Sequence, residues 1–205
     1  MAASKPQVRS LFATPVSIHF LPVAQDVNTT LRPLIVERAG PGARGQGWRS
    51  DNDLSFCGEQ LQTIFRVARD LADGATTTRT GGRVALDWKV EACACVRQKG
   101  EYREFAARPG AFWSGVYYVD DGYAKSDDAA LGGECELADP RGALPAMVAP
   151  QYAFRIPGGQ SAGQTEVIRP NSGMIVVYPS WLMRGERRHD GEQARVTIEF
   201  DMTPP

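Results

Sequence analysis

The chain has 205 residues, a hydrophobic content of 42%, a charged content of 23% and a formal net charge of −1. This length and composition are typical of one globular domain with its own core. The near-neutral charge excludes a strong electrostatic footprint for nucleic acid or an anionic membrane surface. No apolar run approaches the ~18 residues of a membrane span, and residues 1–10 lack the apolar stretch of a secretory signal. We therefore expect a cytoplasmic protein with neither nucleic acid nor membrane as a partner.

We expect one domain over residues 1–205, with an N-terminal part at 1–82 and a core at 83–205. The N-terminal part opens with a partly alternating strand at 11–21, followed by a weak helix at 26–37. The clearest helix follows, because apolar residues recur there at steps of three and four, which makes one apolar stripe. These residues are Leu54, Cys57, Leu61, Ile64, Ala68 and Leu71.

The second part of the chain is expected to consist of strands and turns. Candidate strands lie at 84–96, 112–120, 133–137, 152–156, 165–169, 174–178 and 194–202. Short strands at this spacing, separated by glycine and proline turns, are typical of a sandwich or a jelly roll. The four cysteines have neither the spacing of a disulfide framework nor that of a zinc site, so we expect reduced thiols.

Two motif-rich segments carry a family resemblance. One keeps Gly100, Tyr102, Pro109, Gly110 and the run Trp113 to Val119. The other reads Pro-Asn-Ser-Gly-Met-Ile-Val-Val-Tyr-Pro-Ser-Trp-Leu-Met-Arg over 170–184, and Arg-Val-Thr follows at 195–197. They resemble a small bacterial and phage family of Fe(II)/2-oxoglutarate oxygenases with the patterns Gly-x-Tyr-Asn-x-x-His-x-His/Asp-Pro-Gly, Pro-Ser-Trp-Leu-x-His and Arg-x-Ser. The resemblance implies a mainly β fold: a double-stranded β-helix (jelly roll or cupin-like) with N-terminal helices on its outer face.

The family's three iron ligands match Ala106, Arg108 and Arg184 in this chain. Such Fe(II) sites need two histidines and a carboxylate or close equivalents. Alanine has no donor atom, and arginine stays protonated without a lone pair to offer. We therefore expect no iron and no other required cofactor. Arg195 and Thr197 match the Arg-x-Ser motif, so the resemblance leaves 2-oxoglutarate or another dicarboxylate as a ligand at Arg195.

The resemblance also implies that Arg108, Arg184 and Arg195 project toward one cavity. Three guanidinium groups in one pocket need negative charge among them, and their geometry suits carboxylates and phosphates. This predicts a site for an anionic small molecule. Alternatively, each arginine pairs with a nearby acid or turns to solvent. The acids considered for this are Glu104, Glu186 and Glu199.

Two further side chains are candidate catalytic residues. Cys95 matches an asparagine that faces the cofactor pocket in the family. Neighbouring arginines would lower the pKa of its thiol and make it a nucleophile; alternatively, Cys95 is a small buried hydrophobic residue. Tyr117 lies within the matched run Trp113 to Val119.

Three functions remain open. The first is a metal-independent enzyme of specialised metabolism that catalyses isomerisation, cyclisation or elimination on an anionic small molecule. The second is a catalytically inactive subunit that forms a homodimer or pairs with an active oxygenase. The third is a true Fe(II)/2-oxoglutarate hydroxylase with non-standard ligands, although the two histidines, His19 and His189, are both expected in exposed positions. We favour the first, because the ligand positions changed while the motifs around them stayed intact.

Overall fold

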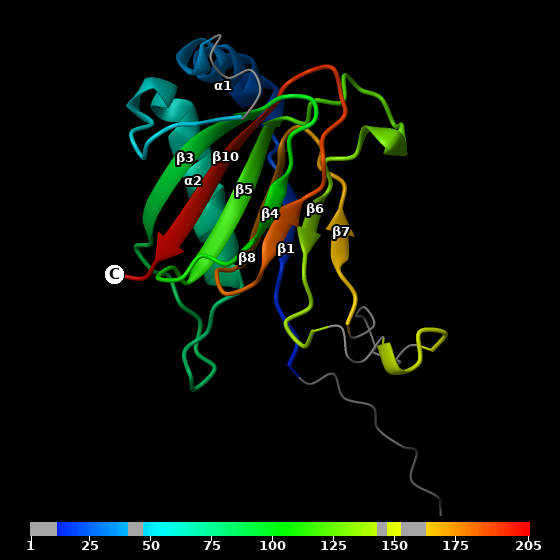
Figure 1. Cartoon of the computed structure of the whole chain (residues 1–205). Coiled ribbons are helices and arrows are strands. Elements are labelled where there is room, and N and C mark those ends of the chain that lie inside the picture. Colours follow the sequence, from blue (N-terminus) through cyan, green and yellow to red (C-terminus); the bar gives the residue numbers. More distant parts are fainter. Residues whose placement is uncertain (1–11, 41–46, 143–146, 153–162) are drawn as a thin grey trace, which may run out of the picture.

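The computed structural model describes residues 12–40, 47–142, 147–152 and 163–205. In these residues the chain folds into two antiparallel sheets, with two long helices beside the larger one (Figure 1). The mainly β fold is confirmed, and the protein is a double-stranded β-helix with helices on its outer face.

The larger sheet contains six strands. In spatial order they are β1 (Ser17–Phe20), β8 (Met174–Pro179), β5 (Trp113–Asp120), β10 (Arg195–Thr203), β3 (Lys89–Arg97) and β2 (Trp48–Arg49). The nine-residue strand β10 pairs along its length with β3 on one side and with β5 on the other. It is therefore an interior strand, flanked by the two other longest strands.

The smaller sheet contains four short strands. In spatial order they are β4 (Arg103–Ala106), β9 (Arg184–Glu186), β6 (Cys135–Leu137) and β7 (Glu166–Ile168). The sequence does not predict β2, β4 or β9, because β2 has only two residues and because β4 (Arg-Glu-Phe-Ala) and β9 (Arg-Gly-Glu) are rich in charge and lack β-branched residues. The strand expected at 152–156 falls from residue 153 onward outside the described residues.

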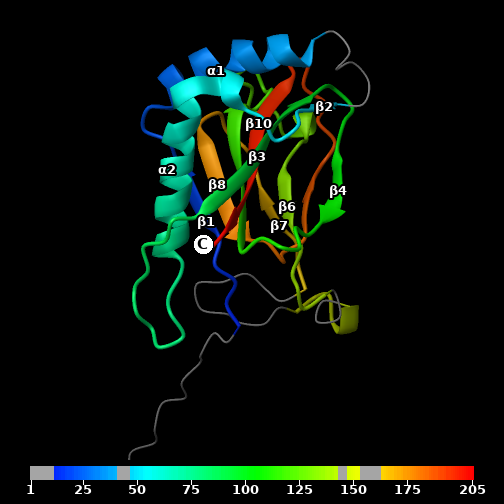
Figure 2. The same ribbon diagram turned by 90° about the vertical axis from the view of Figure 1, so that its left-hand side faces the viewer.

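Both predicted helices are confirmed. They are α1 (Ala24–Ala39) and α2 (Gly58–Gly74), and α2 directly follows a short 3₁₀ turn, η2 (Ser55–Cys57); a second 3₁₀ turn, η3 (Ala129–Leu131), precedes β6. Residues of the expected apolar stripe, including Leu61, Ile64 and Ala68, are buried. Figure 2 shows α1 and α2 on the outer side of the larger sheet. Among the described residues, no helix combines the length and apolar character needed to cross a membrane.

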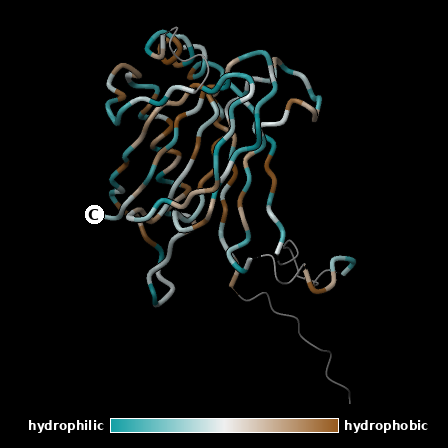
Figure 3. The backbone as a smooth tube through the Cα atoms, in the orientation of Figure 1, coloured by the Kyte–Doolittle hydropathy of each residue, from teal (hydrophilic) through white to brown (hydrophobic). Residues whose placement is uncertain are grey.

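The larger sheet has an apolar face and a mixed face, because side chains alternate along each strand. Val196, Ile198 and Phe200 pack with both helices in the larger apolar core. A smaller apolar core, which includes Val116 and Tyr118, lies on the opposite face, between the two sheets. Apolar stretches follow the strands and helices in Figure 3. The charged residues of the candidate site share the inner space with this smaller core.

Candidate functional site

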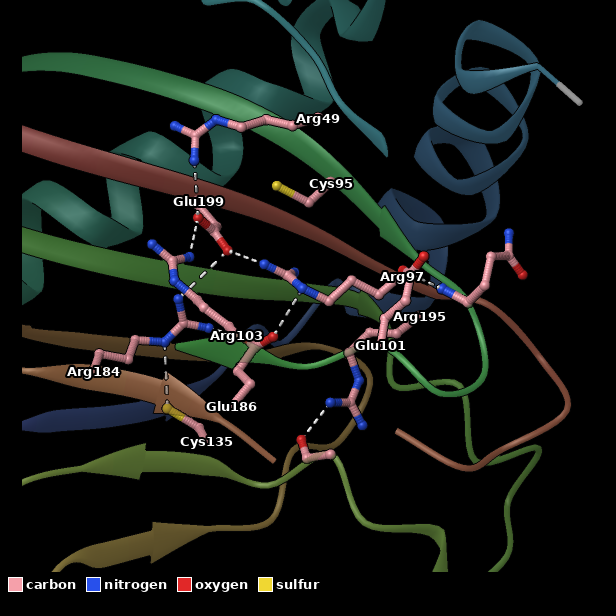
Figure 4. A network of polar contacts seen from close by, with 12 residues as sticks. Arg49, Cys95, Arg97, Glu101, Arg103, Cys135, Arg184, Glu186, Arg195 and Glu199 are labelled. Carbon is pink, nitrogen blue, oxygen red and sulfur yellow. Dashed lines mark hydrogen bonds and ion pairs between the residues drawn. The ribbon is translucent and has the colours of Figure 1, made fainter. Parts of the chain in front are cut away.

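Glu199 is the centre of a dense group of charges between the two sheets. It lies in the middle of β10 and is only 5% exposed. Five arginines contact its carboxylate: Arg97 at 3.1 Å, Arg184 at 3.4 Å, Arg108 at 3.5 Å, Arg49 at 3.6 Å, and Arg103. These five form the arginine cluster, most of which is drawn in Figure 4. Strands β2, β3, β4 and β9 and the segment after β4 each contribute one arginine, so the cluster exists only in the folded chain.

One other buried acid, Glu186, shares the arginine cluster. Its carboxylate pairs with Arg184 and lies 3.2 Å from Nε of Arg97. Nε of Arg184 also donates to Sγ of Cys135 at 3.4 Å. Burial by itself would raise the pKa of Glu199, but the charges of Arg184, Arg97 and Arg103 outweigh it and hold this pKa well below its ordinary value. Both carboxylates are therefore ionised at neutral pH.

The arginine cluster carries more positive charge than its acids neutralise. Five guanidinium groups face two buried carboxylates, an excess of three charges. Two further acids, Glu91 and Asp201, line the adjoining cavity. Glu91 is exposed, and Asp201 accepts a hydrogen bond from Oγ of Ser114 at 2.5 Å. Even when both are counted, five positive charges oppose four negative ones.

A cavity of about 130 Å³ opens against the arginine cluster. Its charged lining includes Arg49, Arg103, Arg108 and Arg184. Of these, Arg184 is fully buried, whereas the side chains of Arg49 and Arg108 are 51% and 29% exposed. The cavity therefore runs from solvent to a buried guanidinium group.

The three positions that match the family's iron ligands do meet in space. Ala106 on β4 pairs directly with Arg184 on β9. Arg108 follows β4, donates its backbone N–H to Ser180 at 2.8 Å, and reaches Glu199 together with Arg184. None of the three side chains has a lone pair for a cation, so they do not fit Fe(II).

Among the described residues, one other group of side chains has donor atoms close enough for a metal. The donor atoms of Cys93, Cys95 and Glu199 all lie within 4.8 Å of one another. However, the Glu199 carboxylate already contacts five guanidinium groups, whose positive charge repels a metal cation at this position.

The two cysteines of β3 are both buried, Cys93 at 1% and Cys95 at 3% exposure, but they differ in their position relative to the cavity. Cys93 lines the cavity, whereas Cys95 lies further along the strand, with its Sγ 4.0 Å from that of Cys93. The hydrogen bond between them lowers the pKa of Cys93 and raises that of Cys95 well above its ordinary value; burial and Glu199 raise Cys95 further. The expectation of a lowered pKa at Cys95 is therefore wrong: Arg97 does lower this pKa, but the hydrogen bond with Cys93, burial and Glu199 outweigh it.

Arg195 lies apart from the arginine cluster, so the expectation of one cavity shared with Arg108 and Arg184 is wrong. Its guanidinium group donates to the backbone carbonyls of Asp121, at 3.0 Å, and Gly133. It also lies 5.2 Å from the ring centroid of Tyr123. Gly133 has a positive φ of 73°, and a Cβ atom there would collide with this guanidinium group, so a substitution would strain the backbone and displace Arg195. No acid among the described residues forms an ion pair with Arg195, and its Nη2 is buried without a hydrogen bond.

The remaining candidates have separate environments. Thr197 is buried on the inner face of β10, and its Oγ1 lacks a hydrogen-bond partner among the described residues. Tyr117 is on the opposite, helix-facing side of the sheet, where its hydroxyl bonds Oδ1 of Asn28 at 2.7 Å. The structure therefore does not bring Tyr117 to the cavity. His189, expected in an exposed turn, is instead 1% exposed, with Nε2 2.9 Å from the carbonyl of Gln193. His19 is exposed as expected.

Sequence reasoning missed most of the arginine cluster. Alternation along β3 places Arg97 on the same face as Cys95, so the side of Arg97 was readable from the sequence. By the same rule, Glu199 lies on the same face of β10 as Arg195. Arg49 and Arg103 carried no such signal, because the short strands that hold them have no periodic pattern. Of the acids proposed as partners, Glu186 and Glu199 pair with the cluster, whereas Glu104 forms no ion pair among the described residues.

Comparison with known families assigns the chain to a class of protein. A family model described as "Putative 2OG-Fe(II) oxygenase" matches residues 92–201, which include most of β3, all of β4 to β9 and most of β10. This match spans more than half of the chain, and the chain belongs to this family. No curated protein sequence matches the chain.

Solved structures of low sequence identity share the fold. A prolyl-4-hydroxylase from Pseudomonas putida is similar with a TM-score of 0.62 and 13% identity over 95% of each chain. AviO1 from Streptomyces viridochromogenes Tue57 gives a TM-score of 0.59 and 15% identity over 94% of this chain and 90% of its own. HygX from Streptomyces hygroscopicus, solved with nickel and 2-oxoglutarate bound, gives 0.57 and 14% over 93% and 83%. At these identities the likeness establishes the fold alone.

Proposed function

We propose that this chain is a metal-independent enzyme that uses the oxygenase scaffold to act on a small anionic molecule at the arginine cluster. The observation that carries the proposal is the charge imbalance, in which five arginines converge on two buried carboxylates. Buried charge of one sign is costly unless it is paired. A bound anion would supply the missing negative charge.

The chemistry and size of the cavity limit the ligand. Guanidinium groups form paired hydrogen bonds with carboxylates and phosphates. The cavity of about 130 Å³ is well below the ~300–1,000 Å³ of pockets for drug-sized ligands. A small carboxylate or phosphate ester therefore suits it better than a large molecule.

The arginine cluster could accelerate reactions in which negative charge develops on the bound molecule. Fixed positive groups that surround such charge lower the barrier, and they do so most strongly where water is excluded. Isomerisation, cyclisation and elimination next to a carboxylate pass through such charge. None of these reactions requires iron, and the ligand positions Ala106, Arg108 and Arg184 do not fit it.

The side chains around Arg195 favour a second, separate binding site for a carboxylate. Its buried Nη2, the hydroxyl of Tyr118 and Oγ1 of Thr197 have no hydrogen-bond partner among the described residues. Tyr118 and Thr197 are opposite each other on neighbouring strands, and Arg195 lies over the Tyr118 ring at 6.0 Å. These donors fit one carboxylate of 2-oxoglutarate or another dicarboxylate, which would there be a ligand without an iron partner.

Thermal unfolding in the presence of small anions tests the proposal. We expect dicarboxylates or phosphate esters to raise the Tm of the wild-type chain, and Arg108→Ala to lose most of this rise. Arg108 is suited to the test because it lines the cavity at partial exposure. Arg188→Ala is the matched control, since this exposed arginine bonds Asp190 at 2.8 Å outside the cluster.

Further measurements on the same purified protein distinguish the proposed enzyme from a true hydroxylase and from an inactive subunit. Stoichiometric iron in the purified protein, with turnover of 2-oxoglutarate, would overturn metal independence and restore a true hydroxylase with non-standard ligands. An absence of stabilisation by any anion would remove the anion site. Anion binding without turnover of any bound molecule would instead identify an inactive binding or partner subunit.

A further inference from the structure

We propose that Cys93 is a nucleophile of this cavity that bonds covalently to small anionic electrophiles held by the arginines, and that the Cys95 thiol donates a hydrogen bond to Cys93. This inference rests on the proposed anion site and adds the reacting atom to it. Cys93 is suited to the role by position, because it lines the cavity that also contains Arg49 and Arg108.

The geometry of β3 explains the pairing of the thiols. Cys93 and Cys95 are two residues apart on one strand and therefore point to the same inner face. Their sulfur atoms are 4.0 Å apart, within reach of an S–H···S contact. Cys95 is opposite Arg49 on β2 and Thr197 on β10, which enclose it on both sides. Cys93 is thus positioned for reaction, and Cys95 is positioned to donate a hydrogen bond to it.

The directions of the pKa shifts of the two thiols agree with a reactive Cys93 and a supporting Cys95. The hydrogen bond between Cys93 and Cys95 lowers the pKa of Cys93 against the opposing effects of burial and Glu199, with Arg49 and Arg108 lowering it further. The thiolate is the nucleophilic form of cysteine, so a lower pKa raises its population at neutral pH. By contrast, Cys57 in the helix-facing core has no such neighbours, and burial raises its pKa to about 11.

An α,β-unsaturated carboxylate illustrates a balanced reaction for this site. The Cys93 thiolate adds to the β carbon, the S–C bond forms, and the electron pair of the double bond moves toward the carboxylate, where arginines stabilise it. Rotation about the resulting single bond and reversal of the addition release the isomerised alkene and restore the thiolate. The cycle needs no oxidant, reductant or metal.

Alkylation by two reagents of similar size and different charge tests the inference. Iodoacetate is anionic and iodoacetamide is neutral; with either, sulfur displaces iodide, which leaves with the electron pair of the C–I bond. In the folded protein we expect the iodoacetate-to-iodoacetamide rate ratio at Cys93 to exceed that in the urea-unfolded chain by about tenfold or more, because a positive cleft concentrates anions. Peptide mass spectrometry assigns the modified cysteine, and Cys57 is the internal control.

Variants separate the contributions. Arg108→Ala should lower the preference for iodoacetate, Cys95→Ala, which removes the hydrogen-bond donor, should slow labelling with both reagents, and Arg188→Ala should change neither. Cys93→Ser should remove the fast-reacting site but retain stabilisation by dicarboxylates or phosphate esters, which also shows that it folds.

Three results would overturn the inference: Cys93 stays unmodified until the chain unfolds, iodoacetamide keeps its usual advantage at this residue, or Cys95 reacts first. If anions still stabilise the protein in those cases, only the role of Cys93 fails. If they do not, the anion site fails with it.

Discussion

The two faces of strand β10 show how one strand serves two different purposes. Val196, Ile198, Phe200 and Met202 face the helices in the larger apolar core. Between them, Thr197 and Glu199 face the opposite sheet, and Glu199 contacts five guanidinium groups. Neighbouring residues of the same strand thus lie in apolar surroundings on one face and in densely charged surroundings on the other.

The contrast separates the sources of stability and of reactivity. Burial of apolar side chains stabilises a fold in proportion to the area removed from water and needs no specific partner. A buried charge depends on the particular groups around it, and an excess of one sign reduces stability unless a counter-ion binds. Substitutions on the helix-facing side should therefore change stability, and substitutions on the inner side should change ligand binding as well.

The largest effect is expected for Glu199→Gln. This change removes one of two carboxylates from among five arginines, and breaking a buried ion pair on one side costs about 3–5 kcal/mol. Urea unfolding should show a loss of this size, and added phosphate or sulfate should restore part of it. As a control, Glu91→Gln at the exposed rim should change the free energy of unfolding by only about 0.5 kcal/mol. A Glu199→Gln variant as stable as the wild type would contradict the central role of this carboxylate.

Acidification provides a second check on Glu199. Its folded-state pKa is held well below the ordinary 4.5. The stability that it contributes is therefore fully present above that ordinary value and is lost as the pH falls toward the folded-state pKa. The wild type should thus lose unfolding free energy more steeply below about pH 4.5 than Glu199→Gln. Glu186, whose pKa is also lowered, should leave the variant some acid sensitivity.

A smaller but comparable loss is expected on the other face for Ile198→Ala. Ile198 is fully buried between the sheet and the helices, and such truncations cost about 2–5 kcal/mol. The rise in Tm caused by dicarboxylates or phosphate esters should nevertheless match that of the wild type. If this variant lost the anion effect, the two faces of β10 would not be independent.

The smallest effect is expected for Tyr117→Phe. It removes the hydrogen bond between the Tyr117 hydroxyl and Asn28 and should cost about 0.5–1.5 kcal/mol in the free energy of unfolding. Because the side chain faces α1, the alkylation rate of Cys93 and the anion-induced Tm shift should not change. A loss of either property would return Tyr117 to the list of catalytic candidates.

Much of the fold was readable from the sequence. The stripe that includes Leu61, Ile64 and Ala68 predicted α2, and the run from Trp113 to Val119 predicted β5. The motifs also predicted that Ala106, Arg108 and Arg184 lie together; Ala106 pairs with Arg184 across β4 and β9, and Arg108 and Arg184 both reach Glu199. Strands β2, β4 and β9 were not predicted. Pairing with strands distant in the sequence stabilises them, and their own residues show no strand pattern.

The sequence by itself determined the alternation of apolar and polar residues along the long strands, the helices that cover one sheet, and the absence of metal-donor side chains at Ala106, Arg108 and Arg184. Only the tertiary structure decided which charges meet. It gathered Arg49, Arg97 and Arg103 with two of the expected residues around Glu199, separated Arg195 from them, and put Cys93 rather than Cys95 at the cavity. The physical reason is that periodicity fixes the side of a strand on which a residue lies, whereas the ends of long, flexible arginine side chains are positioned by partners from other strands.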